Sequence, residues 1–459
     1  MHSSNAMATR ARRLLEGQRA LVIGLAREGV DLARFLSTHG ATVLVTDRKS
    51  QAELQDALGQ LDGAEVTYRL GGHDLNDLGS TDVVYASPGV PPDNELLTAA
   101  RTNGVQVSSL VELFFALCPA PIVGITGSAG KTTSTSLTGE MFLAAGRHVF
   151  VGGNIGRPLL GQLDQMTESS WVVMELSSFQ LEPLRISPHV ALITNVTPNH
   201  LDRHPSMEAY WAAKGQILAH QAPSDWAILN ADDAWSLRYQ PRGMTLRFSL
   251  EGVVEGAYLA AGERVMLLGE PLLETRDIPL RGRHNVANVL AAVATAHASG
   301  IEREAMVEAV RRFQGVPHRL QTVAERAGVL FVDDSIATAP ERSMAALQAY
   351  HEPLVLIAGG RDKHLPMETW AELITRRVRH VVLLGEMSDL VAQAINKADP
   401  TYRALSRATT MDEAVIQAAQ VARSGDVVLL SPGGTSYDMY TDFEQRGRDF
   451  ARAVRELDA

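Results

Sequence analysis

The sequence is poor in cysteine, which limits the chemistry that its side chains can perform. Its 459 residues include one cysteine, Cys118. A single thiol cannot form an internal disulfide and has no thiol partner for a metal cage, so a reducing cytoplasm is the expected compartment. Cys118 precedes Pro119 and is a weak candidate for a nucleophile.

The sequence also lacks long apolar runs and an excess of basic residues. Lys and Arg number 42 against 53 Asp and Glu, a net charge of -11, which argues against a broad surface for nucleic acid or anionic membranes. No apolar run approaches the roughly 18–20 residues of a spanning helix. We therefore expect no nucleic-acid partner and no membrane insertion, and an anionic ligand must bind in a local pocket.

What remains is the composition of a folded chain long enough for about three domains. Apolar residues make up 45% and charged residues 21%, which excludes a disordered or fibrous chain, and a domain holds roughly 150 residues. Residues 1–6 (MHSSNA) are expected to be a leader added for expression, with Met7 as the natural start.

Strand-like and helix-like segments alternate along the chain. Residues 19–47 predict a strand, a glycine turn, a helix and a second strand, and DVVYASPGV predicts a further strand that ends near Ser87. A helix near 110–117 and the breaker CPAP follow, and WVVMEL and VALITNV predict strands further on. VLFVDD, PLVLIAGG, HVVLLGE and DVVLLSPGG alternate with helical segments, which indicates another mostly parallel sheet.

The strongest local signal is the segment GSAGKTT at residues 127–133, between a predicted strand and a predicted helix. Its glycines allow backbone N–H groups to approach phosphate oxygens, Lys131 can neutralise the terminal phosphates, and Thr132 can ligate magnesium. Ile125 occupies the first glycine position of the strict phosphate-loop pattern. The alternative interpretation is a glycine turn with an exposed lysine.

The turn GLAREG at residues 24–29 is a weaker signal for nucleotide binding. It has Ala26 where a dinucleotide fingerprint has its second glycine, and Asp47 closes the second strand where an acid could meet a ribose. The turn favours a nucleotide moiety over NAD. A purely structural turn is the alternative.

These patterns predict an α/β protein of three domains. An N-terminal Rossmann-like nucleotide domain is expected over residues 7–109, a central P-loop ATPase domain with a mostly parallel sheet over 110–314, and a C-terminal Rossmann-like domain over 315–459.

Polar residues follow two predicted strands of the central domain. Glu175 follows one strand, and Asn195, His200 and Asp202 follow another. Carboxylates and imidazoles at strand ends can converge on metal ions, although each residue taken alone is more often a helix cap or a surface group. Lys214 taken alone is typical of a solvated helix lysine.

Eight segments together resemble the Mur ligase family. They are GITGSAGKTT, VGGNIGRPL, VMELSSFQLE, NVTPNHLDRH, GRHNVANVLAA, GVPHRLQ, DDSIAT and SPGGTSYDMYTDFEQRG. Their order and spacing match the family from about Ala20 to the end of the chain. ELSSFQLE and FEQRG resemble the branch that adds glutamate rather than those that add alanine, a diamino acid or a dipeptide.

The resemblance implies ATP-dependent amide bond formation in peptidoglycan biosynthesis. ATP would phosphorylate the terminal carboxylate of UDP-N-acetylmuramoyl-L-alanine, and the amine of D-glutamate would attack the acyl phosphate and expel phosphate. The implied cofactors are ATP, Mg²⁺ or Mn²⁺, and CO₂ or bicarbonate that converts a lysine to its carbamate. These two substrates are the expected partners of a monomeric, cytoplasmic enzyme.

The resemblance also implies roles for individual residues. The catalytic and metal-binding set is Lys131, Thr132, Glu175, His200 and Lys214, the last as a carbamate. ATP contacts are expected at Gly127, Ser128, Ala129, Gly130, Lys131, Thr132, Thr133, Asn285, Asn288, Arg319 and Asp334. The UDP-linked substrate is expected at Leu25, Asp47, Arg48, Ser87, Gly89, Asn154, Ser177 and Gln180, and glutamate at Thr338, Lys363, Ser436 and Phe443.

Three residues depart from the family pattern. Ile336 stands where lysine is common, Asn199 where aspartate is usual, and Ala129 where asparagine is usual. The loss of a cation at Ile336 leaves ligation of L-glutamate as an alternative. A folylpolyglutamate synthase-like ligase is a second alternative, and a nucleotide-sugar sensor without turnover is a third.

Overall fold

The structure is a computed structural model. The chain folds into two compact units, Met1–Phe313 and Gln314–Ala459. Each unit has its own sheets and its own apolar cores. The described residues are 2–154, 159–199, 203–280, 282–363 and 365–457, with side chains from residue 9 onward.

The first sheet is parallel and has the order β3-β2-β1-β4-β5. Its strands are β1 (Arg19–Ile23), β2 (Thr42–Asp47), β3 (Val66–Leu70), β4 (Val83–Ala86) and β5 (Gln106–Ser108). Leu21 on β1 pairs with Leu44 and Val84 and is fully buried, as in a sheet covered on both faces. The accompanying helices are α1 (His2–Leu15), α2 (Arg27–Thr38), α3 (Gln55–Gly59), α4 (Glu95–Thr102) and α5 (Leu110–Leu117).

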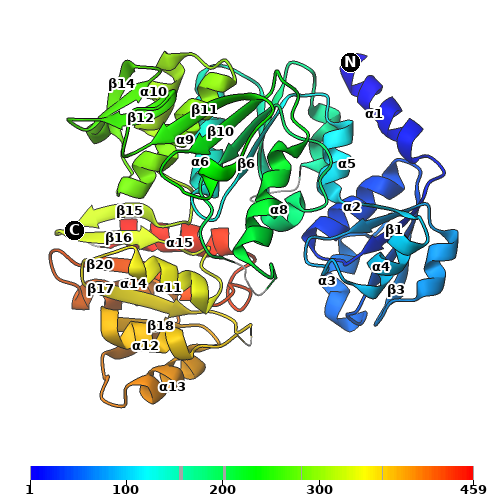
Figure 1. Cartoon of the computed structure of the whole chain (residues 1–459). Helices are drawn as coiled ribbons and strands as arrows, with labels where there is room; N and C mark the ends of the chain where they lie inside the picture. Colours follow the sequence, from blue (N-terminus) through cyan, green and yellow to red (C-terminus); the bar gives the residue numbers. More distant parts are fainter. Residues whose placement is uncertain (1, 155–158, 200–202, 281, 364, 458–459) are drawn as a thin grey trace. The chain divides into compact units, whose positions relative to one another are not determined.

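The second sheet of the same unit has nine strands in the order β14-β13-β12-β11-β10-β9-β6-β8-β7. The strands from β6 to β12 pair in parallel, and β12, β13 and β14 form an antiparallel meander at one edge (Figure 1). The strands are β6 (Ile122–Thr126), β7 (Val149–Gly153), β8 (Trp171–Glu175), β9 (Val190–Ile193), β10 (Trp226–Asn230), β11 (Met244–Ser249), β12 (Gly256–Ala260), β13 (Arg264–Leu267) and β14 (Glu270–Glu274).

The helices of this sheet bring the phosphate loop and the polar strand ends together. They are α6 (Lys131–Ala144), α7 (Ser178–Leu181), α8 (Met207–Ala219), α9 (Arg283–Ala298) and α10 (Arg303–Arg312). The Ala-rich α9 packs against α6 and against β11, since its small side chains allow close approach (Figure 1). Because β6, β8 and β9 are parallel neighbours, the residues that follow them share one edge of the sheet.

The second unit is built on a six-stranded sheet in the order β15-β16-β20-β17-β18-β19, in which only β15 is antiparallel. Its strands are β15 (Gln321–Arg326), β16 (Val329–Asp333), β17 (Leu354–Gly359), β18 (Val378–Leu384), β19 (Leu405–Ala408) and β20 (Val427–Gly433). The helices are α11 (Pro340–Gln348), α12 (Glu368–Arg377), α13 (Ser388–Ala398), α14 (Met411–Val421) and α15 (Phe443–Glu456), and they pack on both faces (Figure 1).

The predicted fold class is confirmed by these sheets. The strands expected around 19–47, 171–176 and 190–196 are β1, β2, β8 and β9, and the helix expected near 110–117 is α5. The three-strand meander over 256–274 was not predicted, because its short strands mix polar and apolar residues without a clean period. Within the described part of the chain, no helix combines the length and the apolar character that a membrane crossing requires.

Candidate active site

The phosphate loop connects β6 to α6, and its glycines are required by close contacts. Gly130 caps α6 with φ +82°, a left-handed conformation that favours glycine. A Cβ atom on Gly130 would lie 2.3 Å from Asn288 Oδ1, and one on Gly127 would lie 1.8 Å from Thr194 Oγ1. Glycine is therefore required at both positions, because the loop packs closely against α9 and against the segment after β9.

The segment after β9 holds the loop in place by hydrogen bonds. The backbone N–H of Ala129 donates to Asn195 Oδ1 (2.9 Å), and Asn195 Nδ2 donates to the Ala129 carbonyl (3.0 Å). Ser128 Oγ donates to the Thr197 carbonyl (2.9 Å). Asn195 is thus a positioning residue for the loop.

Two lysines donate to the same carbonyl of this loop. Lys131 Nζ and Lys214 Nζ each lie 2.9 Å from the Gly127 oxygen. Lys214 is 1% exposed, and its Nζ lies 4.5 Å from the centre of the Tyr210 ring. Burial lowers the pKa of Lys214 well below its usual value, Lys131 lowers it further, and Glu175 opposes the shift. This lysine is therefore not the solvated helix lysine that its sequence context suggests.

Glu175 ends β8 with one carboxylate oxygen unused. Asn154 Nδ2 donates to its Oε1 (2.8 Å), whereas its buried Oε2 accepts no hydrogen bond from the described residues. A buried carboxylate oxygen without a donor is available as a cation ligand. Two residues predicted near it, His200 and Asp202, lie outside the described residues. No cluster of three His, Cys, Asp or Glu side chains able to hold a metal forms within the described ranges.

The other predicted ATP residues of the first unit border the same loop. Asn288 on α9 faces Gly130, and its Nδ2 donates to Asn285 Oδ1 (3.1 Å). Thr132 and Thr133 occupy the first turn of α6, where backbone N–H groups favour anions, and Thr132 is buried. The structure therefore brings these residues together with Lys131.

A cavity of about 610 Å³ lies at the carboxyl edge of the first sheet. It is lined by the five predicted uridine-diphosphate residues Leu25, Asp47, Arg48, Ser87 and Gly89. The Leu25 N–H donates to Asp47 Oδ2 (2.7 Å), and Ser87 Oγ donates to the Gly24 carbonyl (3.0 Å). The turn GLAREG at residues 24–29 requires glycine at its last position, because a Cβ atom on Gly29 would lie 1.9 Å from the Gly24 oxygen.

Ser177 and Gln180 already have partners in the fold. They form a capping box at the start of α7, in which the Gln180 N–H donates to Ser177 Oγ (3.3 Å) and the Ser177 N–H donates to Gln180 Oε1 (2.9 Å). Gln180 Nε2 also donates to Glu28 Oε1 (2.7 Å), and burial raises the pKa of Glu28. The sequence did not indicate a role for Glu28, which ties α2 to α7.

In the second unit, two of the predicted glutamate residues are bonded to each other. Lys363 Nζ donates to Thr338 Oγ1 (3.3 Å). Partial burial lowers the pKa of Lys363, and the positive charges of Arg342 and Arg446 lower it further. The surroundings of Lys363 are therefore electropositive, as a site for a dicarboxylic amino acid requires.

Arg446 was missed by the sequence analysis, although it lies in the FEQRG segment. Arg446 is 3% exposed, and its guanidinium donates to Ser335 Oγ (2.9 Å) and to the Gly434 carbonyl (3.1–3.2 Å). Ser335 Oγ in turn donates to the carbonyl of Phe443 (2.8 Å). The buried Ser436 lies two residues beyond Gly434, so Arg446 joins the segments that carry Thr338, Ser436 and Phe443.

The second unit also holds a buried carboxyl group, Asp334. Ser431 Oγ donates to its Oδ2 (2.8 Å) and the Leu320 N–H to its Oδ1 (3.3 Å). Burial raises the pKa of Asp334 to about 7, against the effect of these bonds and of Arg319. Asp334 and Arg319, both predicted ATP residues, thus lie in one part of the second unit.

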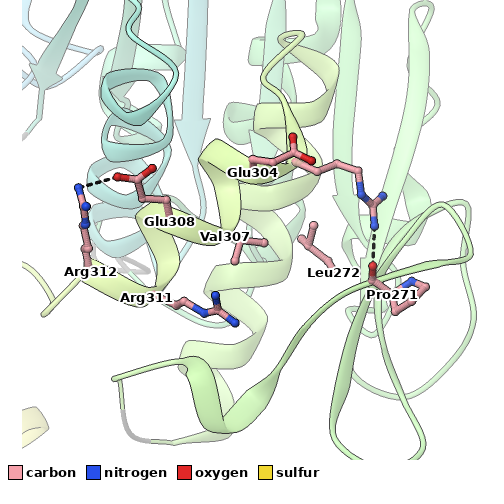
Figure 2. A pocket seen from close by; sticks show the side chains of 8 residues that line it. Pro271, Leu272, Glu304, Val307, Glu308, Arg311 and Arg312 are labelled. Carbon is pink, nitrogen blue, oxygen red and sulfur yellow. Dashed lines mark hydrogen bonds and ion pairs between the residues drawn. The ribbon is translucent and has the colours of Figure 1, made fainter.

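A further pocket of about 500 Å³ lies in the first unit, between α10 and β14. Figure 2 shows Glu308 paired with Arg312 (2.6 Å) on its rim, and Arg303 donates to the Pro271 carbonyl (2.7 Å). Arg311 pairs with Asp277 (3.0 Å). Arg311 and Arg312 are therefore paired with carboxylates, and Arg303 donates to a backbone carbonyl.

Three family models match successive parts of the chain: "Mur ligase MurD-like, N-terminal domain" over residues 18–109, "Mur ligase middle domain" over 125–296 and "Mur ligase, glutamate ligase domain" over 318–434. A UDP-N-acetylmuramoylalanine--D-glutamate ligase of Symbiobacterium thermophilum is 40% identical over 96% of this chain and 98% of its own length. The chain belongs to the Mur ligase family. The protein of the same name from Pelotomaculum thermopropionicum is also 40% identical, over 96% and 98%.

Solved structures of other Mur ligases share the fold. The UDP-N-acetylmuramate-alanine ligase of Thermotoga maritima has a TM-score of 0.55 at 18% identity, covering 96% of this chain and all of that one. MurF from Acinetobacter baumannii has a TM-score of 0.54 at 18% identity, covering 96% and 92%. The family assignment makes this chain an ATP-dependent ligase of peptidoglycan synthesis.

Proposed function

We propose that the protein joins D-glutamate to UDP-N-acetylmuramoyl-L-alanine at the expense of ATP. The names of the full-length relatives support this substrate pair. The observation that carries the proposal is the convergence of Lys131, Lys214 and Glu175 around the phosphate loop, since this set serves phosphoryl transfer to a carboxylate. A sensor without turnover would not require such a set.

The residues at this loop fit a divalent cation. The free Oε2 of Glu175 and the hydroxyl of Thr132 would hold it, with His200, which lies outside the described residues, as a further ligand. When bound, Mg²⁺ or Mn²⁺ would neutralise charge between the substrate carboxylate and the γ-phosphate. Lys131 would add a positive charge at the terminal phosphates.

Lys214 is suited to carbamate formation. Its lowered pKa increases the neutral fraction, and only a neutral amine attacks CO₂. The ammonium first loses one proton to solvent, the neutral amine nitrogen forms a bond to the carbon of CO₂, and a second proton leaves the nitrogen, so that a cation is replaced by an anion. This anion would then lie beside Lys131 and could orient the cation site.

In the second unit, Lys363 and Thr338 would receive the carboxylates of glutamate, with Ser436 and Phe443 held nearby by Arg446. A cation and hydroxyl donors suit a carboxylate ligand. The cavity at Leu25, Asp47, Arg48, Ser87 and Gly89 would receive the uridine diphosphate.

The test is phosphate release from ATP with UDP-N-acetylmuramoyl-L-alanine, Mg²⁺, bicarbonate and each glutamate enantiomer in parallel. We expect release that depends on D-glutamate. Release with L-glutamate alone would reverse the assigned stereochemistry, and no release with either enantiomer would remove the ligase assignment. A folylpolyglutamate synthase-like activity would instead appear with a folate substrate, which the N-terminal domain match disfavours.

A further inference from the structure

The motif NVTPNHLDRH contains an arginine to which the chemistry above gives no role. Arg203 Nη2 donates to the Pro88 carbonyl (3.0 Å) and to the Val90 carbonyl (2.8 Å), and Nη1 donates to the Gly89 carbonyl (3.3 Å). One guanidinium thus binds three consecutive carbonyls that lie more than 110 residues away in the sequence. The same residues, 88–90, line the cavity for the uridine diphosphate.

One face of this guanidinium rests on the ring of Phe179 in α7. Arg203 Cζ lies 4.8 Å from the centre of the Phe179 ring, and His204 stacks on that ring at 5.3 Å. Phe179 lies between Ser177 and Gln180 in the sequence. Arg203 therefore fixes the cavity loop and α7 to each other through its two sides.

The first residue of the 87–90 loop is fixed by backbone contacts that do not involve Arg203. The Ser87 N–H donates to the Ile23 carbonyl (3.1 Å), and the Val90 N–H donates to the Ser87 carbonyl (2.9 Å). Without Arg203, the carbonyls of residues 88–90 would lose three charge-assisted hydrogen bonds, and the loop would keep its bonds to β1 and the bond from Arg101 to the Pro92 carbonyl (2.7 Å). The arrangement suits arginine because a planar guanidinium can stack on a ring and donate in several directions, which an ammonium cannot.

We propose that Arg203 is a positioning residue that presents the 87–90 loop to the uridine-diphosphate end of the substrate. The proposal rests on the proposed function for the identity of that ligand. Arg203 contacts the loop backbone and Phe179, so its effect on the nucleotide passes through the shape of the cavity. A separate link between Gln180 and Glu28 ties α7 to α2, and Glu28 lines the same cavity.

The experiment compares Arg203→Ala, Arg203→Lys and Phe179→Leu with Arg238→Ala. Arg238 is a matched control, because it is exposed and stacks on Trp211 (4.9 Å) and Trp235 (4.3 Å) in the same domain. Titration calorimetry with UDP itself measures the cavity without requiring turnover. Circular dichroism and the melting temperature show whether each variant is folded.

We expect Arg203→Ala to weaken UDP binding about 10-fold or more, since several hydrogen bonds to a charged group are lost. Arg203→Lys should lie between this variant and wild type, Phe179→Leu should weaken binding less, and Arg238→Ala should match wild type. In turnover, the KM for the UDP-linked substrate should rise while the KM for ATP stays within about twofold.

Wild-type UDP affinity in any folded Arg203 variant would overturn the proposal, and so would an equal rise in both KM values. If Arg203→Ala does not fold, Arg203→Lys and Phe179→Leu carry the same test. Because UDP binding is measured apart from ligation, a wild-type protein that binds UDP but forms no product would remove the proposed function and leave the role of Arg203 testable.

Discussion

In the first unit, the phosphate loop is held by Asn195, Thr194 and Asn288, and both lysines that face it are bonded to its backbone. In the second unit, the proposed glutamate pocket depends on Lys363, an exposed lysine whose Nζ donates to Thr338 Oγ1 (3.3 Å). The lysine proposed to act at the ATP end, Lys214, is thus buried and bonded to the loop, whereas the lysine proposed for the amino-acid end is exposed and stands beside segments held by the buried Arg446. We expect substitutions at the ATP end to affect turnover and substitutions at the amino-acid end to affect the affinity for glutamate.

The largest effect is expected for Lys214→Ala. Loss of the buried anion should reduce kcat about 100-fold or more, comparable to loss of one preorganised group that stabilises the transition state. Short carboxylic acids should restore part of the activity by supplying the anion. The matched control is Lys397→Ala on α13, an exposed helix lysine. Unchanged turnover in Lys214→Ala would contradict the account of the phosphate loop.

A smaller effect is expected for Lys363→Ala, and on a different parameter. Removing one cation from a carboxylate site should raise the KM for glutamate about 10-fold, which corresponds to the loss of one charge-assisted hydrogen bond. The kcat and the KM for ATP should change little. A fall in kcat with an unchanged KM for glutamate would place Lys363 in the chemical step and break the contrast between the two ends.

The buried carboxyl group of Asp334 should make the stability of the protein depend on pH. Burial raises the pKa of Asp334 in the folded protein to about 7, above its ordinary value of about 3.8, so its contribution to stability is fully present below about pH 4 and is lost as pH rises through 7. Asp334→Asn should remove this part of the pH dependence, a difference of a few °C in melting temperature. The measurement is a thermal melt of both proteins from pH 4 to pH 8, and parallel curves would contradict the raised pKa.

The smallest effect is expected for Ile336→Lys. It restores the cation that the family commonly has, at a half-buried position two residues before Thr338. A long lysine side chain can carry its ammonium from this position to solvent, where a charge interaction contributes less than about 1 kcal/mol, so the KM for D-glutamate should fall only about two- to fivefold. A tenfold change in the KM for D-glutamate, or a reversal of the preferred enantiomer, would show that residue 336 determines specificity. It would contradict a pocket in which Lys363 is the main cation.

Motifs that are local in the sequence could be predicted, whereas contacts between distant segments could not. GSAGKTT indicated the phosphate loop because its chemistry lies within seven residues, and the strand ends at Glu175 and Asp47 followed from apolar runs. Arg203 and Arg446 were not found, because their partners lie 113–115 and 12–111 residues away and no spacing rule joins them. The burial of Lys214 was equally hidden, since its helix α8 has no clear apolar stripe.

The central claim is that the substrate carboxylate is activated by the γ-phosphate of ATP. It is tested most directly with UDP-N-acetylmuramoyl-L-alanine carrying ¹⁸O in its terminal carboxylate. The carboxylate oxygen that attacks phosphorus remains on phosphate when the amine of glutamate attacks carbon. We predict that phosphate released in the presence of D-glutamate contains one ¹⁸O atom per product formed. Product formation with phosphate that contains no label would contradict the account.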